Sequence, residues 1–128
     1  MVNAQEWLDK KYPKEQRKLM TKLDIEGKNL EGSLDLTDFT NLEELYCNSV
    51  IEEERGEEVE EKTQWNQLTN LDVSKCQKLR ILKCQYNHLK SINISGCSKL
   101  EILHCYYNYL ADLNLHDSKD WYIKAWYC

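Results

Sequence analysis

The sequence contains little glycine or proline and no long apolar run. Four Gly and one Pro in 128 residues argue against a low-complexity chain and against a fold built from tight hairpins. No apolar run approaches the roughly 18 to 20 residues that a membrane span needs. The N-terminus lacks the charged and apolar regions of a secretory signal. A chain of 128 residues is expected to form one domain, and these absences predict no membrane segment and a cytoplasmic, reducing setting.

The chain also lacks a basic surplus and the short motifs of common enzymes. Its formal net charge is −5, and no basic stripe that would bind nucleic acid is visible. A Gly-rich phosphate loop, a Ser nucleophile elbow and paired carboxylates are missing. His88, His104 and His116 fall at three different positions of the repeat described next, so they are not expected to converge on a metal. We therefore expect no nucleic-acid partner, no cofactor, no metal and no enzyme activity.

One 21-residue pattern occurs twice in succession. A fixed period of about 20 to 29 residues built on Leu and Asn predicts a leucine-rich repeat solenoid. Degenerate copies extend the pattern back to Leu23. The two regular copies consist of Leu79, Leu82, Cys84, Asn87, Leu89, Ile92, Ile94 and Cys97, and then of Leu100, Leu103, Cys105, Asn108, Leu110, Leu113 and Leu115.

Each copy contains two short alternating segments, 82–84 and 92–94 in the first regular copy. Alternation with a period of two predicts a strand in each. The expected fold is an α/β solenoid, mainly parallel β, with two strands per 21-residue coil and two sheets facing one core. Residues 1–22 are expected to form a helical N-terminal cap, residues 23–116 the repeat array, and residues 117–128 a short aromatic C-terminal cap.

The N-terminal cap is expected to contain two helices that cover the open end of the array. Asn3 and Glu6 form a weak capping box for the first helix. Pro13 interrupts it and suits the first turn of a second helix. That helix is expected over 14–20, with Leu19 and Met20 facing the body. The aromatic residues of 117–128 either cover the last repeat or precede a continued array.

An acidic insertion interrupts the pattern after its second copy begins. In a regular copy the strand Cys and the bend Asn lie close together, as Cys84 and Asn87 do, whereas Cys47 and Asn66 are separated by an added segment. Residues 51–62 contain seven Glu, one Arg and one Lys, which accounts for the whole net charge. We expect a disordered loop over about 49–65. It is either a solvated linker or a binding segment for a basic partner.

Five cysteines occupy core positions of the repeat, where other copies place Leu, Phe or Ile. A free Cys at such a position behaves as a small buried hydrophobe. Cysteines in neighbouring rows would have parallel Cβ vectors, which suits neither a disulfide nor the converging ligands of zinc. Buried, reduced thiols are therefore favoured at Cys47, Cys76, Cys84, Cys97 and Cys105.

Three asparagines recur at the bend after the first strand of each coil, namely Asn66, Asn87 and Asn108. A buried Asn can bond backbone groups that a bend leaves unpaired. These residues are therefore expected to form a structural ladder rather than a catalytic feature.

Residues that alternate with the core positions should form the exposed faces of the two sheets. The face of the first sheet carries Tyr, Ile and His, which suit contact with a protein, although they also favour strands in general. The second face is small and polar, with Asp72, Ser74, Asn93, Ser95, Asn114 and His116. The candidate protein-binding face on the first sheet is Glu44, Tyr46, Asn48, Ile81, Lys83, Gln85, Ile102, His104 and Tyr106.

The pattern over residues 23–115 resembles the 21-residue leucine-rich repeat class called IRREKO, most closely over 66–115. Residues 3–13 and 28–36 resemble the first segment of fungal proteins with such repeats, in which the array stands alone or precedes other domains, including kinase-like ones. The resemblance implies binding and scaffolding. We therefore expect a monomeric, non-catalytic protein-interaction module. The alternative is a cap or spacer of a larger signalling protein with no ligand of its own.

Overall fold

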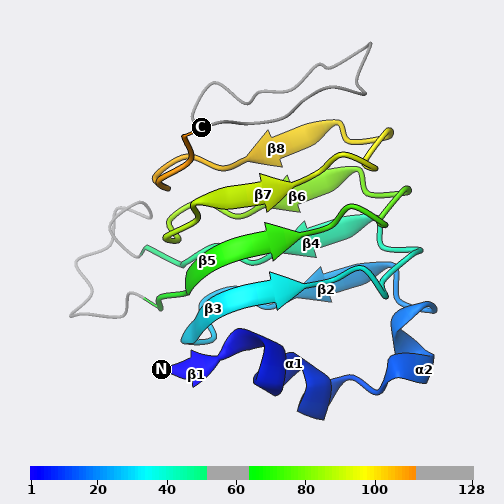
Figure 1. Cartoon of the computed structure of the whole chain (residues 1–128), viewed down its shortest axis with the longest axis horizontal. Coiled ribbons are helices and arrows are strands. Elements are labelled where there is room, and N and C mark those ends of the chain that lie inside the picture. Colours follow the sequence, from blue (N-terminus) through cyan, green and yellow to red (C-terminus); the bar gives the residue numbers. More distant parts are fainter. Residues whose placement is uncertain (52–63, 112–128) are drawn as a thin grey trace.

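Two parallel sheets of four strands each form the body of the protein. The computed structural model describes residues 1–51 and 64–111. The first sheet has the order β2-β4-β6-β8 and the second sheet the order β1-β3-β5-β7. The strands of the first sheet are Lys22–Asp24, Glu44–Tyr46, Ile81–Lys83 and Ile102–His104, and those of the second are Val2–Asn3, Leu30–Asp35, Gln67–Asp72 and Ser91–Asn93. Helices α1 (Ala4–Lys11) and α2 (Lys14–Arg17) lie at the N-terminal end of the stack (Figure 1).

The chain crosses from one sheet to the other at each turn, so strands stack in sequence order within each sheet (Figure 1). Leu82 lies opposite Leu103 and Ile81 opposite Ile102, and the partners of each pair are 21 residues apart in the sequence. The prediction of two parallel sheets facing one core is therefore confirmed. Strand β1 was not predicted from the sequence. It adds an edge strand, with Val2 beside Leu30.

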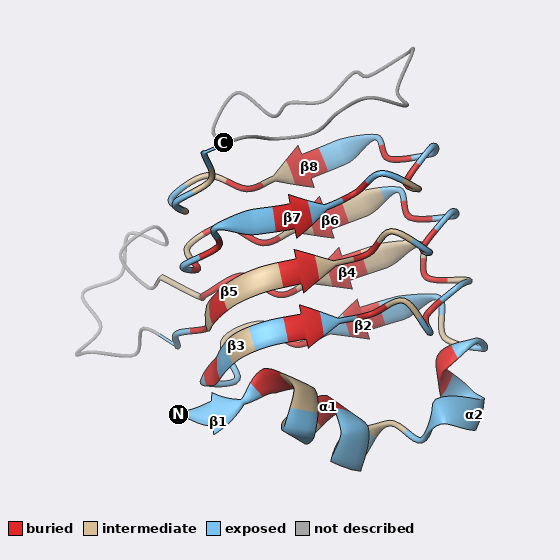
Figure 2. Cartoon of the chain, viewed as in Figure 1, coloured by how far each residue is buried: buried red, intermediate tan, exposed pale blue. Residues whose placement is uncertain are grey.

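The core lies between the two sheets and consists mainly of leucines. Figure 2 shows buried positions alternating with exposed ones along the strands. Leu23, Leu45, Leu82 and Leu103 form the inner row of the first sheet and are at most 1% exposed. Burying a Leu side chain contributes about 1.5 to 3 kcal/mol, so these rows are the main source of cohesion between successive coils.

Helix α1 begins as the sequence predicts. The Asn3 side chain accepts a hydrogen bond from the Glu6 backbone N–H at 3.0 Å, and Leu8 on the inner side is fully buried. Helix α2 is shorter than expected, because it ends at Arg17 rather than Met20. The prediction that Leu19 faces the body is wrong, since its side chain is 75% exposed.

A buried arginine holds the two helices together and explains how so short a helix docks. The Arg17 guanidinium donates to Asp9 at 2.8 Å and to Asp38 at 3.4 Å. Its Nε donates to the Tyr12 carbonyl at 3.0 Å. The hydrogen bond from Arg17 holds the pKa of Asp9 below its usual value. The charged side chain of Arg17 therefore docks α2 against the body, and this docking does not require an apolar residue at position 19.

Several predictions concern residues 52–63 and 112–128, outside the described part of the chain. They are the order of the acidic insertion, the cap over 117–128, and the positions of Asn114 and His116. The expected bounds of the insertion, 49–65, are too wide, because Ser49 is buried and Val50 forms an antiparallel bridge with Gln64. In the described part, no helix has both the length and the apolar character needed to cross a membrane.

Candidate functional site

The outer face of the first sheet carries two rows of side chains set by the strand register. Lys22, Glu44, Ile81 and Ile102 form one row, and Asp24, Tyr46, Lys83 and His104 form the next. Neighbouring positions within a row are about 4.8 Å apart, so adjacent side chains touch. Of the nine predicted face residues, the structure thus places six in these rows: Glu44, Tyr46, Ile81, Lys83, Ile102 and His104.

Tyr46 is the centre of the polar contacts on this face. Its hydroxyl donates a hydrogen bond of 2.6 Å to Glu44 Oε1. That bond to a carboxylate favours the protonated phenol and, with partial desolvation, raises the pKa of Tyr46 to about 12. The Nζ atoms of Lys22 and Lys83 lie 5.4 and 5.7 Å from the ring centroid, within range of a cation–π attraction. The ring is therefore held in one position.

Asn48 and Gln85 do not belong to the exposed face, and their prediction as surface residues is wrong. Each is only 8% exposed. The alternation of strand residues ends at Tyr46 and Lys83, where β4 and β6 end and the chain bends, so the next positions turn inward. Asn48 Nδ2 donates to the Ser49 carbonyl at 3.1 Å. Asn48 Oδ1 and Gln85 Oε1 are buried without a hydrogen-bond partner among the described residues.

A cluster of tyrosines extends the face beyond the end of the strands. The Tyr86 and Tyr107 rings stack with centroids 4.7 Å apart and an angle of 9°. Tyr106, a predicted face residue, contacts Tyr86 edge-on at 5.4 Å and lies 5.9 Å from the His104 ring. Tyr107 is 71% exposed. We call Tyr86, Tyr106 and Tyr107 the tyrosine cluster.

Alternation along the strands does not predict Tyr86 and Tyr107 as face residues, because both lie beyond the strand ends at Lys83 and His104. Both have a positive φ, 58° and 54°, and Gly27 has 53° at the equivalent bend. A bulky residue in this conformation is rare and strained. The equal spacing of Tyr86 and Tyr107 within successive copies was a signal for this pair, since equivalent positions of neighbouring coils lie side by side.

The three predicted ladder asparagines form hydrogen bonds at successive bends. Asn66 Oδ1 accepts from the N–H groups of Lys28 and Leu30, each at 3.1 Å. Asn87 accepts from the Leu68 N–H at 2.9 Å, and Asn108 accepts from the Leu89 N–H at 2.9 Å. The amide nitrogens of the three side chains donate to carbonyls of the same and the preceding coils. These side chains are fully used in holding the bends.

Four of the five predicted core cysteines, Cys47, Cys76, Cys84 and Cys97, are free and buried. Desolvation raises the pKa of each thiol, to about 12 for Cys76 and Cys97. Cys105 is buried as well, but it is disulfide-bonded, so the prediction of a reduced thiol is wrong there. Parallel Cβ vectors disfavour bridges only between stacked neighbours, and Cys105 ends its row in the described part of the chain.

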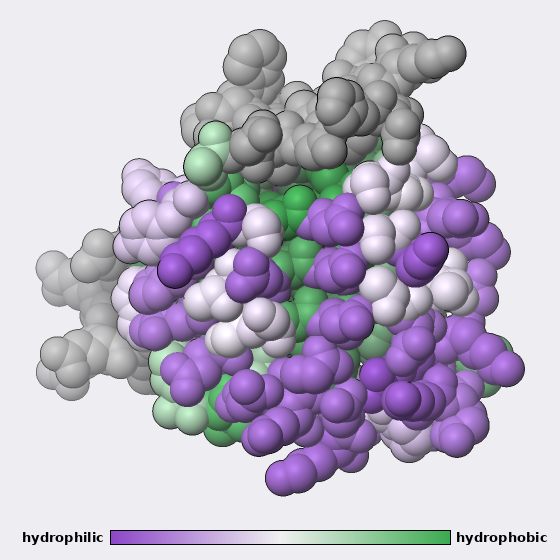
Figure 3. All heavy atoms as spheres, viewed as in Figure 1, coloured by the Kyte–Doolittle hydropathy of each residue, from purple (hydrophilic) through white to green (hydrophobic). Residues whose placement is uncertain are grey.

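The outer face of the second sheet is polar, as predicted for Asp72, Ser74, Asn93 and Ser95. It contains a shallow groove of about 530 Å³ with Leu34 and Leu71 at its floor and Ser, Asn and Asp at its sides. Figure 3 shows this apolar stripe between polar columns. The polar groups bond one another: Ser33 to Asn70 at 3.3 Å, and Asn70 to Ser91 at 2.6 Å.

Residues able to hold a metal do not cluster in the described ranges, 1–51 and 64–111, where no group of three His, Cys, Asp or Glu side chains is suitably placed. His88 and His104 are separated: His88 contacts Tyr109 and His104 contacts Tyr106.

Comparison with protein-family models, curated proteins and solved structures found no match. The resemblance to leucine-rich repeat proteins therefore rests on the residues of this chain alone.

Proposed function

We propose that this chain is a short leucine-rich repeat solenoid of the 21-residue class that acts as a non-catalytic protein-interaction module. Support for the repeat comes from the register, which sets Leu82 beside Leu103 and Leu71 beside Ile92. The asparagine bonds at successive bends add to it. In a solenoid each coil contacts only its neighbours, and the stacked strands present a continuous surface to a partner.

The binding surface in this proposal is the outer face of the first sheet together with the tyrosine cluster. The observation that carries it is the continuity of ring contacts from His104 through Tyr106 and Tyr86 to exposed Tyr107. Aromatic side chains supply contact area at a small entropy cost and are enriched in protein interfaces. Because these rings already pack against one another, little further ordering is needed when a partner binds.

The charges on this face favour a partner segment with both apolar and polar groups. Lys22, Glu44 and Lys83 alternate in sign around Tyr46. Ile81 and Ile102 lie side by side, and Ile102 is 37% exposed. A face of this kind selects its partner by shape and by the pairing of individual charges, because it has no large region of one charge sign.

The competing hypothesis is a cap or spacer domain of a larger protein, without a ligand of its own. Capture of crosslinked partners by the intact chain separates the two. We expect partner recovery to fall at least fivefold when Tyr46, Lys83, His104 and Tyr106 are replaced together by Ala. The single change Tyr107→Ser should also lower partner recovery, but by a smaller factor. Because Tyr107 is exposed, this change leaves the packing of the half-buried side chains intact.

The matched control is a triple Ala replacement on the second sheet, at Glu31, Ser91 and Asn93, which are all exposed. It should leave recovery unchanged. Far-UV circular dichroism of each variant establishes that the fold is retained. Equal recovery of the same partners by the face variant, the Tyr107→Ser variant and the control would support the spacer hypothesis and contradict the binding face.

A further inference from the structure

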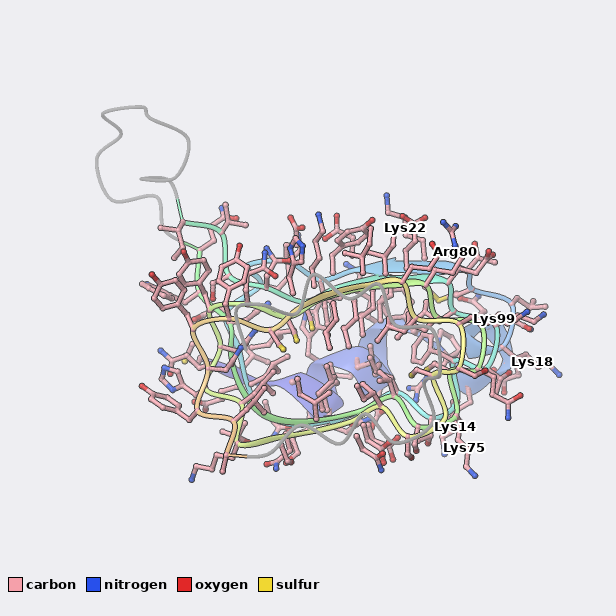
Figure 4. All side chains as sticks on the ribbon, turned by 90° about the horizontal axis from the view of Figure 1, so that it is seen from above. Lys14, Lys18, Lys22, Lys75, Arg80 and Lys99 are labelled. Carbon is pink, nitrogen blue, oxygen red and sulfur yellow. The ribbon has the colours of Figure 1, made fainter. Side chains whose placement is uncertain are left out.

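A strip of positive charge runs along one edge of the molecule, built from parts of the chain that are far apart in sequence. This edge consists of α2, the segment after it as far as Lys22 at the start of β2, and the turns that lead from the second sheet to the first. Figure 4 shows six cations around it. We call this strip the basic edge and define it by these labelled residues: Lys14, Lys18, Lys22, Lys75, Arg80 and Lys99.

The stacking of the turns brings these cations together. The Arg80 N–H donates to the Glu43 carbonyl at 2.8 Å, and the Glu101 N–H donates to the Arg80 carbonyl at 2.8 Å. The Asn41 side chain donates to the Lys18 carbonyl, which joins the first of these turns to the segment after α2. The turns 36–43, 73–80 and 94–101 therefore follow one another along the edge.

The basic edge carries a surplus of positive charge. Arg17 is already paired with Asp9 and Asp38; apart from Arg17 and Asp38, residues 14–22, 36–43, 73–80 and 94–101 contain seven Lys or Arg against three Glu. Arg80 forms an exposed ion pair with Glu101 at 3.2 Å. Among the described residues, no ion pair is formed by Lys75 or Lys99, and both are exposed. A surplus of this kind attracts a polyanion.

The sequence contains one segment of matching charge. Residues 51–62 carry seven Glu against Arg55 and Lys62; we call them the acidic segment. The described chain ends at its first residue and resumes after it at the opposite edge, where Val50 and Gln64 form an antiparallel bridge. The charges of the molecule are therefore divided: a cationic surplus lies along one edge, and seven Glu are attached to the other.

The acidic segment is too short to lie along the basic edge of its own molecule. The residues between 51 and 64 must leave and return to one place, so at full extension they reach about 22 Å from it. The path from Glu44 to Val50 is at most roughly 20 Å long at about 3.3 Å per residue, and the turns bearing Lys75, Arg80 and Lys99 begin beyond Glu44. Within one molecule only the middle of a fully extended acidic segment would come near these cations, whereas in another molecule several Glu side chains can meet several Lys side chains at once.

We propose that the basic edge binds the acidic segment of a second copy of this chain, so that the molecules associate head to tail. Such a contact is heterologous: it joins two different surfaces and leaves one of each unfilled at the ends. Contacts between exposed charges are weak and are screened by salt. Association therefore requires high protein concentration and low ionic strength, and dilute protein is monomeric.

The first test uses a labelled peptide of residues 51–62 and the intact chain, with binding measured by fluorescence anisotropy. We expect binding at low salt that weakens as NaCl rises from about 0.02 to about 0.3 M. Changing Lys75→Glu and Lys99→Glu together should weaken it roughly tenfold or more, because repulsion replaces attraction at both sites. The same peptide with every Glu replaced by Gln should not bind.

The matched control reverses two exposed lysines at the opposite edge, Lys28→Glu and Lys90→Glu. It changes the net charge of the chain by the same amount, and it should alter binding less than twofold. Absence of peptide binding at low salt would overturn the proposal, as would equal losses in the two double variants. An RNA oligonucleotide or an anionic vesicle that binds the edge more tightly than the peptide would assign the edge to that polyanion instead.

The second test measures self-association of the full chain by sedimentation velocity at high concentration. We expect the sedimentation coefficient to rise with concentration at low salt. The rise should vanish in the K75E/K99E variant and in a chain whose seven Glu of residues 51–62 are changed to Gln, and it should persist in the K28E/K90E control. Concentration-dependent association of both the K75E/K99E variant and the chain with Glu changed to Gln would contradict the head-to-tail contact.

Discussion

At the scale of single residues, Asn87 shows how one side chain organises a bend. Its Oδ1 accepts from the Leu68 N–H at 2.9 Å, and its Nδ2 donates to the carbonyls of Cys47 and Cys84 at 3.0 and 3.1 Å. One amide therefore pairs backbone groups of three successive segments. Because the residue is only 3% exposed, these bonds are shielded from bulk water in the folded protein.

We expect Asn87→Ala to lower the free energy of unfolding by about 1 to 3 kcal/mol, the cost of leaving buried backbone groups unpaired. Urea denaturation followed by circular dichroism measures this change. The control is Asn93→Ala, because Asn93 is exposed and its side chain bonds within its own turn, to Ser95. Equal denaturation midpoints for the two variants would show that the ladder contributes nothing to stability.

The burial of single residues could be predicted from sequence where it follows the regular spacing of Leu and Asn, and could not be predicted where the chain bends. The asparagines and leucines recur with the period of the repeat, and their burial follows from that recurrence. The alternation of strand residues predicts Asn48 and Gln85 on the surface only if the strands continue beyond Tyr46 and Lys83, where they end. No local signal marks the end of such a short strand, so only the stacked backbone shows that these two side chains turn inward.

At the scale of elements, the turns on the basic-edge side are packed closely enough to require a glycine. A Cβ on Gly96 would overlap the Ser74 carbonyl oxygen, so no side chain fits while the two turns keep their positions. The turns are in direct contact here, and the atom in the way belongs to the backbone rather than to a flexible side chain that could move aside. Their spacing is thus set by backbone against backbone.

We expect Gly96→Ala to destabilise the fold by roughly 2 kcal/mol or more, because one turn must shift against its neighbour. Thermal denaturation of the variant measures the loss. Ser98→Ala in the same turn serves as the control, since Ser98 is exposed, and it should change stability by less than about 0.5 kcal/mol. A Gly96→Ala protein as stable as the wild type would mean that the turns have room to separate.

The N-terminal elements show a different limit of prediction from sequence. Asn3 and Glu6 belong to one helical turn, and their capping contact was predicted because it is local. The docking of α2 depends on Arg17 reaching Asp38, a residue of the first turn beyond β3. A buried arginine cannot be distinguished from an exposed one by sequence pattern, so the sequence predicts apolar Leu19 in the docking role that Arg17 has.

At the scale of the whole molecule, the buried thiols link global stability to pH. Desolvation raises the pKa of Cys47, Cys76, Cys84 and Cys97 in the folded state, to about 12 for Cys76 and Cys97. An unfolded thiol has a pKa near about 8.5. Below that pH the thiols are protonated in both the folded and the unfolded protein, so they do not lower the free energy of unfolding. As pH rises above it, the unfolded state ionises first, and stability falls with about 1.4 kcal/mol per pH unit for each thiol.

We therefore expect the free energy of unfolding to fall between about pH 8.5 and about pH 10.5, and to fall less steeply in a Cys76→Ala/Cys97→Ala variant. Urea denaturation at several pH values gives the two slopes. Because two of four thiols are removed, about half of the thiol contribution to the slope should disappear. Other groups that titrate in this range, such as lysines, are common to both proteins and cancel in the difference. Parallel slopes would contradict a titration shift at these two thiols.

The buried leucines and asparagines and the two parallel sheets could be predicted from the 21-residue spacing of Leu, Cys and Asn, because each depends on position along the chain. The contacts between successive coils could not be predicted in this way. The folded chain gathers Lys18, Lys75 and Lys99 into one edge, stacks Tyr86 on Tyr107, and buries Arg17 between two carboxylates. These contacts join positions whose residue types follow no common pattern, so they become visible only once the turns are stacked.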